Sequence, residues 1–141
     1  MQGLKPHTRD ERLAIAQTLI PQFEQKFGDN LIAIALVASV ARNADRAYSD
    51  LELLVFLHNT PTEGDPYLQR VYNGMLIEVE YVTEEHYLEL WRMLGRGWWA
   101  GGASPLVPLT NAPFIEALLG KRNGYQHPRS AYLRRAARKQ V

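Results

Sequence analysis

The clearest hydrophobic pattern lies between residues 31 and 57, where two apolar runs flank a polar segment. Residues 31–38 are apolar without interruption, and residues 51–57 are apolar except for Glu52. Short apolar runs bounded by polar segments are typical of strands that are buried on both faces. We therefore predict strands at residues 31–38 and 51–58, joined by a polar loop.

A helix is predicted ahead of these strands, over residues 8–27. Thr8 can cap its first turn, with Glu11 as the reciprocal partner of a capping box. Apolar residues follow at helical spacing, namely Leu13, Ala16, Leu19, Ile20, Phe23 and Phe27. Gly28 then ends the helix. Pro21 lies inside it and predicts a kink or a division into two helices.

A β-hairpin is predicted after the second strand and a turn-rich loop at residues 59–66. Its strands cover residues 67–72 and 75–82, and Asn73-Gly74 forms the tight turn between them. Side chains alternate between the two faces of a strand. Over residues 75–82, one face therefore carries Ile77, Val79 and Tyr81, and the other carries Leu76, Glu78, Glu80 and Val82.

The remaining pattern predicts further helices around a short edge strand. One helix runs from Thr83 to about Leu94, and residues 105–109 form the edge strand. Asn111 caps another helix that ends at Gly120, and residues 129–140 form a last basic helix. The order of these elements predicts an α+β fold with a small mixed sheet backed by helices.

Length and composition narrow the class of protein. A chain of 141 residues is expected to form one domain, spanning residues 1–141. The net charge of +1 argues against a general nucleic-acid binder. The absence of cysteine excludes disulfides and thiolate metal sites. With no signal peptide in the pattern and no apolar run long enough for a membrane, we expect a soluble, cytoplasmic protein.

Carboxylates at the start of the second strand are the first candidates for chemistry. Asp50 and Glu52 point to the same side, roughly 7 Å apart along the strand. If the strand at residues 75–82 is a neighbour, Glu78 stands beside them, with Glu80 as the alternative third carboxylate. Carboxylates this close repel one another unless a cation lies between them, so they predict a site for one or two Mg²⁺ ions. The plainer alternative is an exposed strand edge with no ligand.

The polar loop between the two strands offers contacts for phosphate. Ser39 supplies a hydroxyl and a backbone amide, and Arg42 can make a forked contact with phosphate oxygens. Two plainer readings stay open at this point. Ser39 could simply end its strand, and Arg42 could pair with Asp45 on the surface.

These residues resemble a known signature. Ala38-Ser39, followed after ten residues by Asp50-Leu51-Glu52, resembles the Gly-Ser … Asp-x-Asp/Glu signature of the polymerase-β-type nucleotidyltransferases. Within that superfamily the chain is most similar to the kanamycin (aminoglycoside) nucleotidyltransferases, from about residue 31 to residue 120. The similarity also includes Arg42, Ala44-Asp45, Tyr48-Ser49, Ile77-Glu78-Val79, Glu84-Glu85 and the segment 106–109.

The resemblance implies roles for six residues. Asp50, Glu52 and Glu78 would be the catalytic Mg²⁺ ligands. The nucleotide would be bound by three further residues, Ser39, Arg42 and Ser49. The implied reaction transfers a nucleoside monophosphate from a nucleoside triphosphate such as ATP to a hydroxyl acceptor and releases pyrophosphate.

Two departures from the family pattern bear on activity. Ala38 stands where the family has glycine, which allows positive φ or close approach of a phosphate. The family's helical C-terminal domain, which supplies the general base and much of the acceptor pocket, is expected to be absent. Glu80 is one substitute base, and a second copy of the chain or a partner protein is another source.

Three functions therefore remain open. The first is a nucleotidyltransferase that acts on a small, aminoglycoside-like hydroxyl acceptor. The second is a minimal, antitoxin-type nucleotidyltransferase that adenylylates a partner protein. The third is a non-catalytic binding domain that retains the fold.

Overall fold

The computed structural model describes residues 3–61, 64, 66–94 and 105–124. Their helices and strands, in chain order, are α1 (Arg9–Phe27), η1 (Gly28–Asn30), β1 (Leu31–Leu36), α2 (Ala38–Ala41), β2 (Leu51–Leu57), β3 (Tyr67–Tyr72), β4 (Met75–Val82), α3 (Glu84–Leu94), β5 (Val107–Thr110) and α4 (Ala112–Gly124). No helix within these ranges is both long and apolar enough to cross a membrane.

The described strands form one sheet in the order β3-β4-β2-β1-β5. β2 and β4 are parallel, whereas β1 with β2, β1 with β5, and β3 with β4 are antiparallel pairs. β3 and β5 are the two edges of this sheet. The predicted α+β fold with a mixed sheet and helices is confirmed.

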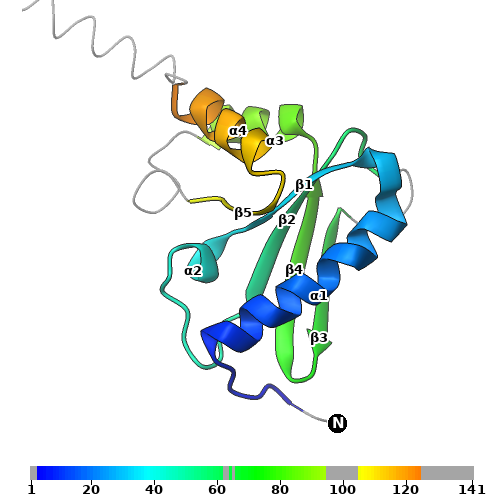
Figure 1. The fold of residues 1–141 in the computed structure, drawn as a ribbon. Coiled ribbons are helices and arrows are strands. Elements are labelled where there is room, and N and C mark those ends of the chain that lie inside the picture. The colour runs from blue at the N-terminus through cyan, green and yellow to red at the C-terminus, as the bar shows by residue number, and fades with distance from the viewer. Residues whose placement is uncertain (1–2, 62–63, 65, 95–104, 125–141) are drawn as a thin grey trace, which may run out of the picture.

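The two faces of the sheet are covered to different extents (Figure 1). α1 lies across one face and buries the larger apolar cluster, which includes Phe23, Leu53 and Ile77. On the other face, α3 and α4 pack near the ends of β2 and β4, over Phe56 and Val82. Nearer the start of β2 this second face carries carboxylates in place of apolar side chains, since residues 52, 54 and 56 share one side of the strand.

The prediction of the first helix is confirmed, including its capping box between Thr8 and Glu11. The predicted division at Pro21 is wrong, because α1 continues through this residue to Phe27. Proline removes a hydrogen bond to the carbonyl four residues earlier, here that of Gln17. Pro21 and Gln17 are both exposed, so water can reach that carbonyl. Packing of the apolar side of α1 then outweighs the local cost of proline.

Several predicted boundaries need correction. The first strand ends at Leu36, because Ala38 already belongs to α2, and the helix capped by Asn111 continues past Gly120 to Gly124. The single glycine is tolerated there because Leu118 and Arg122 on either side of it are buried. The Asn73-Gly74 hairpin is confirmed, with positive φ angles of 49° and 77°. The predicted helix at residues 129–140 lies outside the described residues.

Candidate active site

Three carboxylates meet where β2 begins. The parallel register of β2 and β4 places Glu52 directly beside Glu78, and Asp50 lies two residues before Glu52 on the same side. One oxygen from each of Asp50, Glu52 and Glu78 lies within 4.8 Å of the other two. The structure therefore brings together the three acids that the sequence singled out. Glu80 is exposed and does not belong to this group.

We call Asp50, Glu52 and Glu78 the acidic cluster, and the raised pKa values of Asp50 and Glu52 reflect negative charges that oppose one another. Burial raises the pKa of Asp50, and the charge of Glu78 raises it further. Burial also raises the pKa of Glu52, reinforced by the charges of Glu78 and Asp50 and by a hydrogen bond with Glu78, whereas Arg42 lowers it. Carboxylates held together against repulsion gain stability from a bound cation.

The donor set fits a hard divalent cation. Carboxylate oxygens are the ligands that Mg²⁺ prefers, at about 2.1 Å, which places two oxygens on one ion about 2.9 to 4.2 Å apart. The oxygens of the acidic cluster spread over at most 4.8 Å, so small side-chain rotations bring them within that range. All three residues are half-buried, which leaves the site open to solvent.

The turn from β1 into α2 has an unusual backbone. Ala38 has a φ of 60°, in the left-handed region that costs an L-residue about 1–2 kcal/mol. Among the residues that the structure describes, the other non-glycine residues with positive φ are all asparagine, namely Asn43, Asn73 and Asn111. Asparagine tolerates this region far better than alanine does. The turn therefore stores strain beside the acidic cluster, as functional turns often do.

This turn places Ser39 and Arg42 near the acidic cluster. The backbone N–H of Val37 donates to the carbonyl oxygen of Glu52 at 3.1 Å, which fixes the start of α2 against the start of β2. Ser39 is half-buried within α2. Arg42 follows α2 and is exposed, and its charge reaches Glu52, whose pKa it lowers.

The alternative pairing of Arg42 with Asp45 is wrong. Asp45 instead binds two arginines of α1, with its Oδ1 2.6 Å from Arg9 Nη1 and its Oδ2 2.9 Å from Arg12 Nε. The side chain of Asp45 is only 3% exposed. Burial alone would raise its pKa, but the hydrogen bonds from Arg12 and Arg9 outweigh burial and leave the pKa of Asp45 below its usual value.

Arg9, Arg12 and Asp45 form a clamp that the sequence reasoning missed. Arg12 is 1% exposed and also donates to the carbonyl oxygen of Arg46, while Arg9 donates to that of Val40 at 2.9 Å. The loop after α2 therefore runs beside the first turns of α1 (Figure 1). The clamp fixes the loop that carries Arg42 and leads to Asp50. A signal was available, because Arg12 lies four residues before Ala16 on the apolar side of the helix.

Ser49 closes a turn within this loop. Its hydroxyl oxygen accepts a hydrogen bond from the backbone N–H of Arg46 at 2.7 Å, and its own N–H donates to the carbonyl oxygen of Arg46 at 3.0 Å. In this arrangement the Ser49 hydroxyl shapes the approach to Asp50. Its role as a nucleotide contact stays a prediction.

Two polar residues of β3 also contact the acidic cluster, and the sequence reasoning did not select them. Gln69 Nε2 donates to Glu78 Oε1 at 2.8 Å. A hydrogen bond with Glu78, followed by slight burial and the charges of the three acids, raises the pKa of Tyr67 to about 12. The available signal was the hairpin register, which places Gln69 directly opposite Glu78.

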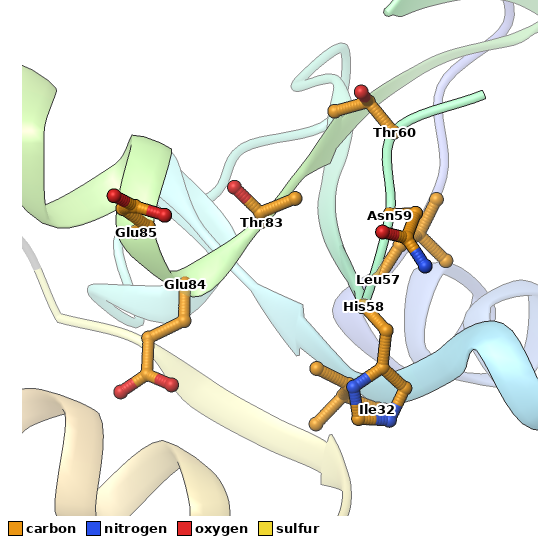
Figure 2. Close-up of a pocket in the computed structure, with 8 residues that line it drawn as sticks. All are labelled: Ile32, Leu57, His58, Asn59, Thr60, Thr83, Glu84 and Glu85. Carbon is orange, nitrogen blue, oxygen red and sulfur yellow. The ribbon is translucent and has the colours of Figure 1, made fainter. Parts of the chain in front are cut away.

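A polar pocket of about 610 Å³ lies at the far ends of β2 and β4 (Figure 2). Its lining comes from β1, the end of β2 with the segment after it, and the start of α3, and consists of Ile32, Leu57, His58, Asn59, Thr60, Thr83, Glu84 and Glu85. Leu57 is five residues beyond Glu52, about 17 Å along the strand. The pocket is therefore separate from the acidic cluster, and none of the six predicted site residues lines it.

Comparison with known proteins adds independent information. No protein-family profile matches the sequence. Two proteins named aminoglycoside nucleotidyltransferase (4′), from Staphylococcus aureus and from a Bacillus species, are each 28% identical over 112 residues, which is 79% of this chain and 40% of theirs. A third relative, "Putative protein adenylyltransferase MJ1305" of Methanocaldococcus jannaschii, is 43% identical over 54 residues, 37% of either chain. The chain thus spans about two fifths of the length of the curated relatives it matches.

Proposed function

This chain is a distant homologue of the polymerase-β-like nucleotidyltransferases, and on that premise we propose that it is a Mg²⁺-dependent nucleotidyltransferase. The reaction would move a nucleoside monophosphate from a nucleoside triphosphate to a hydroxyl acceptor. The observation that carries the proposal is the convergence of Asp50, Glu52 and Glu78 from two parallel strands, beside the turn that carries Ser39.

Each part of the proposed site has a distinct task. Asp50, Glu52 and Glu78 would hold one or two Mg²⁺ ions, which neutralise phosphate charge and make an acceptor hydroxyl more acidic. Ser39 would donate to a phosphate oxygen from the turn that Ala38 opens. Arg42, exposed at the end of α2, is free to turn toward the phosphates of a nucleotide bound over the acidic cluster.

The transfer balances with one bond formed and one broken. The acceptor oxygen forms a bond to the α-phosphorus while the bond from that phosphorus to the bridging oxygen of pyrophosphate breaks. The proton of the acceptor hydroxyl passes to a base. Glu80 is our candidate for that base, because it is exposed on the same side of β4 as Glu78. A second copy of the chain or a partner protein is the alternative source.

Two acceptor classes follow from the relatives. A small, aminoglycoside-like hydroxyl compound is our first choice, since similarity to the two aminoglycoside enzymes covers 112 residues. A protein hydroxyl is the second choice, favoured by the higher identity of 43% to the archaeal relative over 54 residues. Both acceptors use the same donor nucleotide and the same acidic cluster.

The deciding experiment is calorimetric binding of a non-hydrolysable ATP analogue with and without Mg²⁺. The wild type is compared with Asp50→Asn and with Glu24→Gln, a matched change at an exposed carboxylate of α1. We expect Mg²⁺-dependent binding in the wild type and in Glu24→Gln, and its loss in Asp50→Asn. Equal binding by all three proteins, or none by any of them, would contradict the proposal and favour a non-catalytic domain.

The acceptor is then identified by transfer of radiolabelled nucleotide. One reaction contains a panel of aminoglycosides, and a second contains purified proteins encoded beside this chain. Label on a small molecule supports the first acceptor class, and label on a protein supports the second. Loss of label in Asp50→Asn is the required control in both reactions.

A further inference from the structure

We propose that Tyr67 and Gln69 of β3 are positioning residues that hold the Glu78 carboxylate in its metal-binding orientation. The proposal rests on the proposed function and adds two residues to its site. Neither residue is expected to touch the substrate phosphates. Both would act through Glu78.

The register of the hairpin places both residues beside Glu78. In the antiparallel pair of β3 and β4, Gln69 is opposite Glu78 and Tyr67 is opposite Glu80. Residues 67 and 69 share one side of β3, which is the side of β4 that carries Glu78 and Glu80. Tyr67 and Gln69 therefore both lie on the open part of the sheet, next to the acidic cluster.

Both side chains contact the Glu78 carboxylate. Gln69 Nε2 donates to Glu78 Oε1 at 2.8 Å, and the Tyr67 hydroxyl is also hydrogen-bonded to Glu78. Tyr67 remains 44% exposed, so its ring is not simply buried in the core. The two hydrogen bonds restrict a flexible glutamate, one oxygen of which lies within 4.8 Å of a carboxylate oxygen of both Asp50 and Glu52.

Tyr67 and Gln69 are both uncharged donors, and this suits them to orient Glu78 beside a bound cation. Glu78 on an open strand would otherwise turn away from Asp50 and Glu52, because the three charges repel. An arginine or lysine in place of Gln69 would hold Glu78 by a salt bridge but would cancel part of the charge that attracts the cation. An amide and a phenol orient the carboxylate and leave its full charge available to the metal.

The competing explanation is that these are ordinary cross-strand pairs that stabilise the hairpin. The two explanations differ in what a substitution changes. A structural pair affects the stability of the metal-free protein, whereas a positioning pair affects metal affinity. Partners of metal ligands typically contribute about 10- to 100-fold to that affinity.

The test is Mn²⁺ titration by calorimetry of the wild type, Tyr67→Phe, Gln69→Leu and the double variant. Tyr72→Phe is the matched control, since Tyr72 is a half-exposed tyrosine of the same strand on its opposite side. We expect Mn²⁺ affinity to fall about 3- to 10-fold in each single variant and about 10- to 100-fold in the double variant. Tyr72→Phe should bind Mn²⁺ as the wild type does, and thermal melts should show every variant folded.

Activity gives a second readout. The Mg²⁺ concentration for half-maximal activity should rise in the double variant, while kcat at saturating Mg²⁺ stays within a few-fold of the wild type. Unchanged Mn²⁺ affinity in the double variant would overturn the positioning role and leave the proposed function intact. Failure of the wild type itself to bind Mn²⁺ would overturn the metal site and the proposed function together.

Discussion

Glu52 and Glu78 face each other directly across the parallel strands β2 and β4, and their carboxyl groups are close enough to hydrogen-bond. Such a pair is unfavourable in its fully ionised form without a cation. The fold accepts this cost in the part of the sheet that α3 and α4 leave open. Stability of the metal-free protein and affinity for a divalent ion are therefore coupled at this one pair.

The first prediction concerns pH and Mg²⁺. The pKa values of Asp50 and Glu52 are raised in the folded state, so their ionisation destabilises the fold. The penalty is absent below their unfolded pKa values and grows as pH rises through the folded ones. At pH 7, bound Mg²⁺ should relieve this electrostatic penalty. At a Mg²⁺ concentration ten times its Kd, the free energy of unfolding should rise by about 1.4 kcal/mol.

Thermal melts of the wild type and Glu52→Gln between pH 5 and pH 8 measure this effect. We expect Glu52→Gln to be more stable than the wild type at pH 7 without Mg²⁺, to vary less with pH, and to gain little from Mg²⁺. Glu24→Gln should match the wild type throughout. A loss of stability in metal-free Glu52→Gln at pH 7 would argue against repulsion within the acidic cluster.

The second prediction concerns the strained turn. Ala38→Gly removes the cost of about 1–2 kcal/mol that the left-handed conformation imposes on alanine. Glycine also makes the unfolded chain more flexible, which lowers the stability of the fold by about 0.4–1 kcal/mol. The net gain in the free energy of unfolding should therefore lie between about zero and about 1.6 kcal/mol. Urea denaturation measures it. Asn43→Gly is the matched control, because Asn43 has a similar φ of 56° but asparagine tolerates this conformation. An equally large gain in the free energy of unfolding for Asn43→Gly would refute the strain at Ala38.

The third prediction concerns the buried clamp. Asp45→Asn leaves Arg12 buried without its charge partner and should lower the free energy of unfolding by about 3–5 kcal/mol. The control is Lys121→Gln, which breaks the exposed ion pair with Glu84 and should cost less than about 1 kcal/mol. Denaturant unfolding of both variants provides the comparison. Equal losses would show that burial does not strengthen the contribution of the clamp.

The helices, the strands and the acidic cluster could largely be predicted from local patterns. Alternation along residues 75–82 placed Glu78 and Glu80 on one side, and the apolar run of β2 located Asp50 and Glu52 at its start. The local hydrophobic pattern did not show whether β4 is the neighbour of β2 in the sheet. In the structure the two strands pair in parallel, and this pairing brings Glu78, rather than Glu80, into the acidic cluster.

The missed features depend on contacts between residues distant in sequence. Arg12 meets Asp45 across 33 residues, and a charged residue on a helix is normally read as exposed. Ala38 was expected to continue a strand because alanine carries no signal for positive φ. Gln69 meets Glu78 only once the hairpin register is known. Local pattern describes single elements, while these residues act between elements.

The hairpin of β3 and β4 also determines where the chain can accept insertions. An extra residue between Gly74 and Glu78 would shift the strand by one position and exchange its two sides. The Glu78 carboxylate would then point into the apolar layer under α1, and Ile77 would take its place among the acids. Residues 59–61 lie in the connection before β3 and are free of this constraint. We therefore expect natural length variation to collect before β3 and to be excluded from the three residues between Gly74 and Glu78.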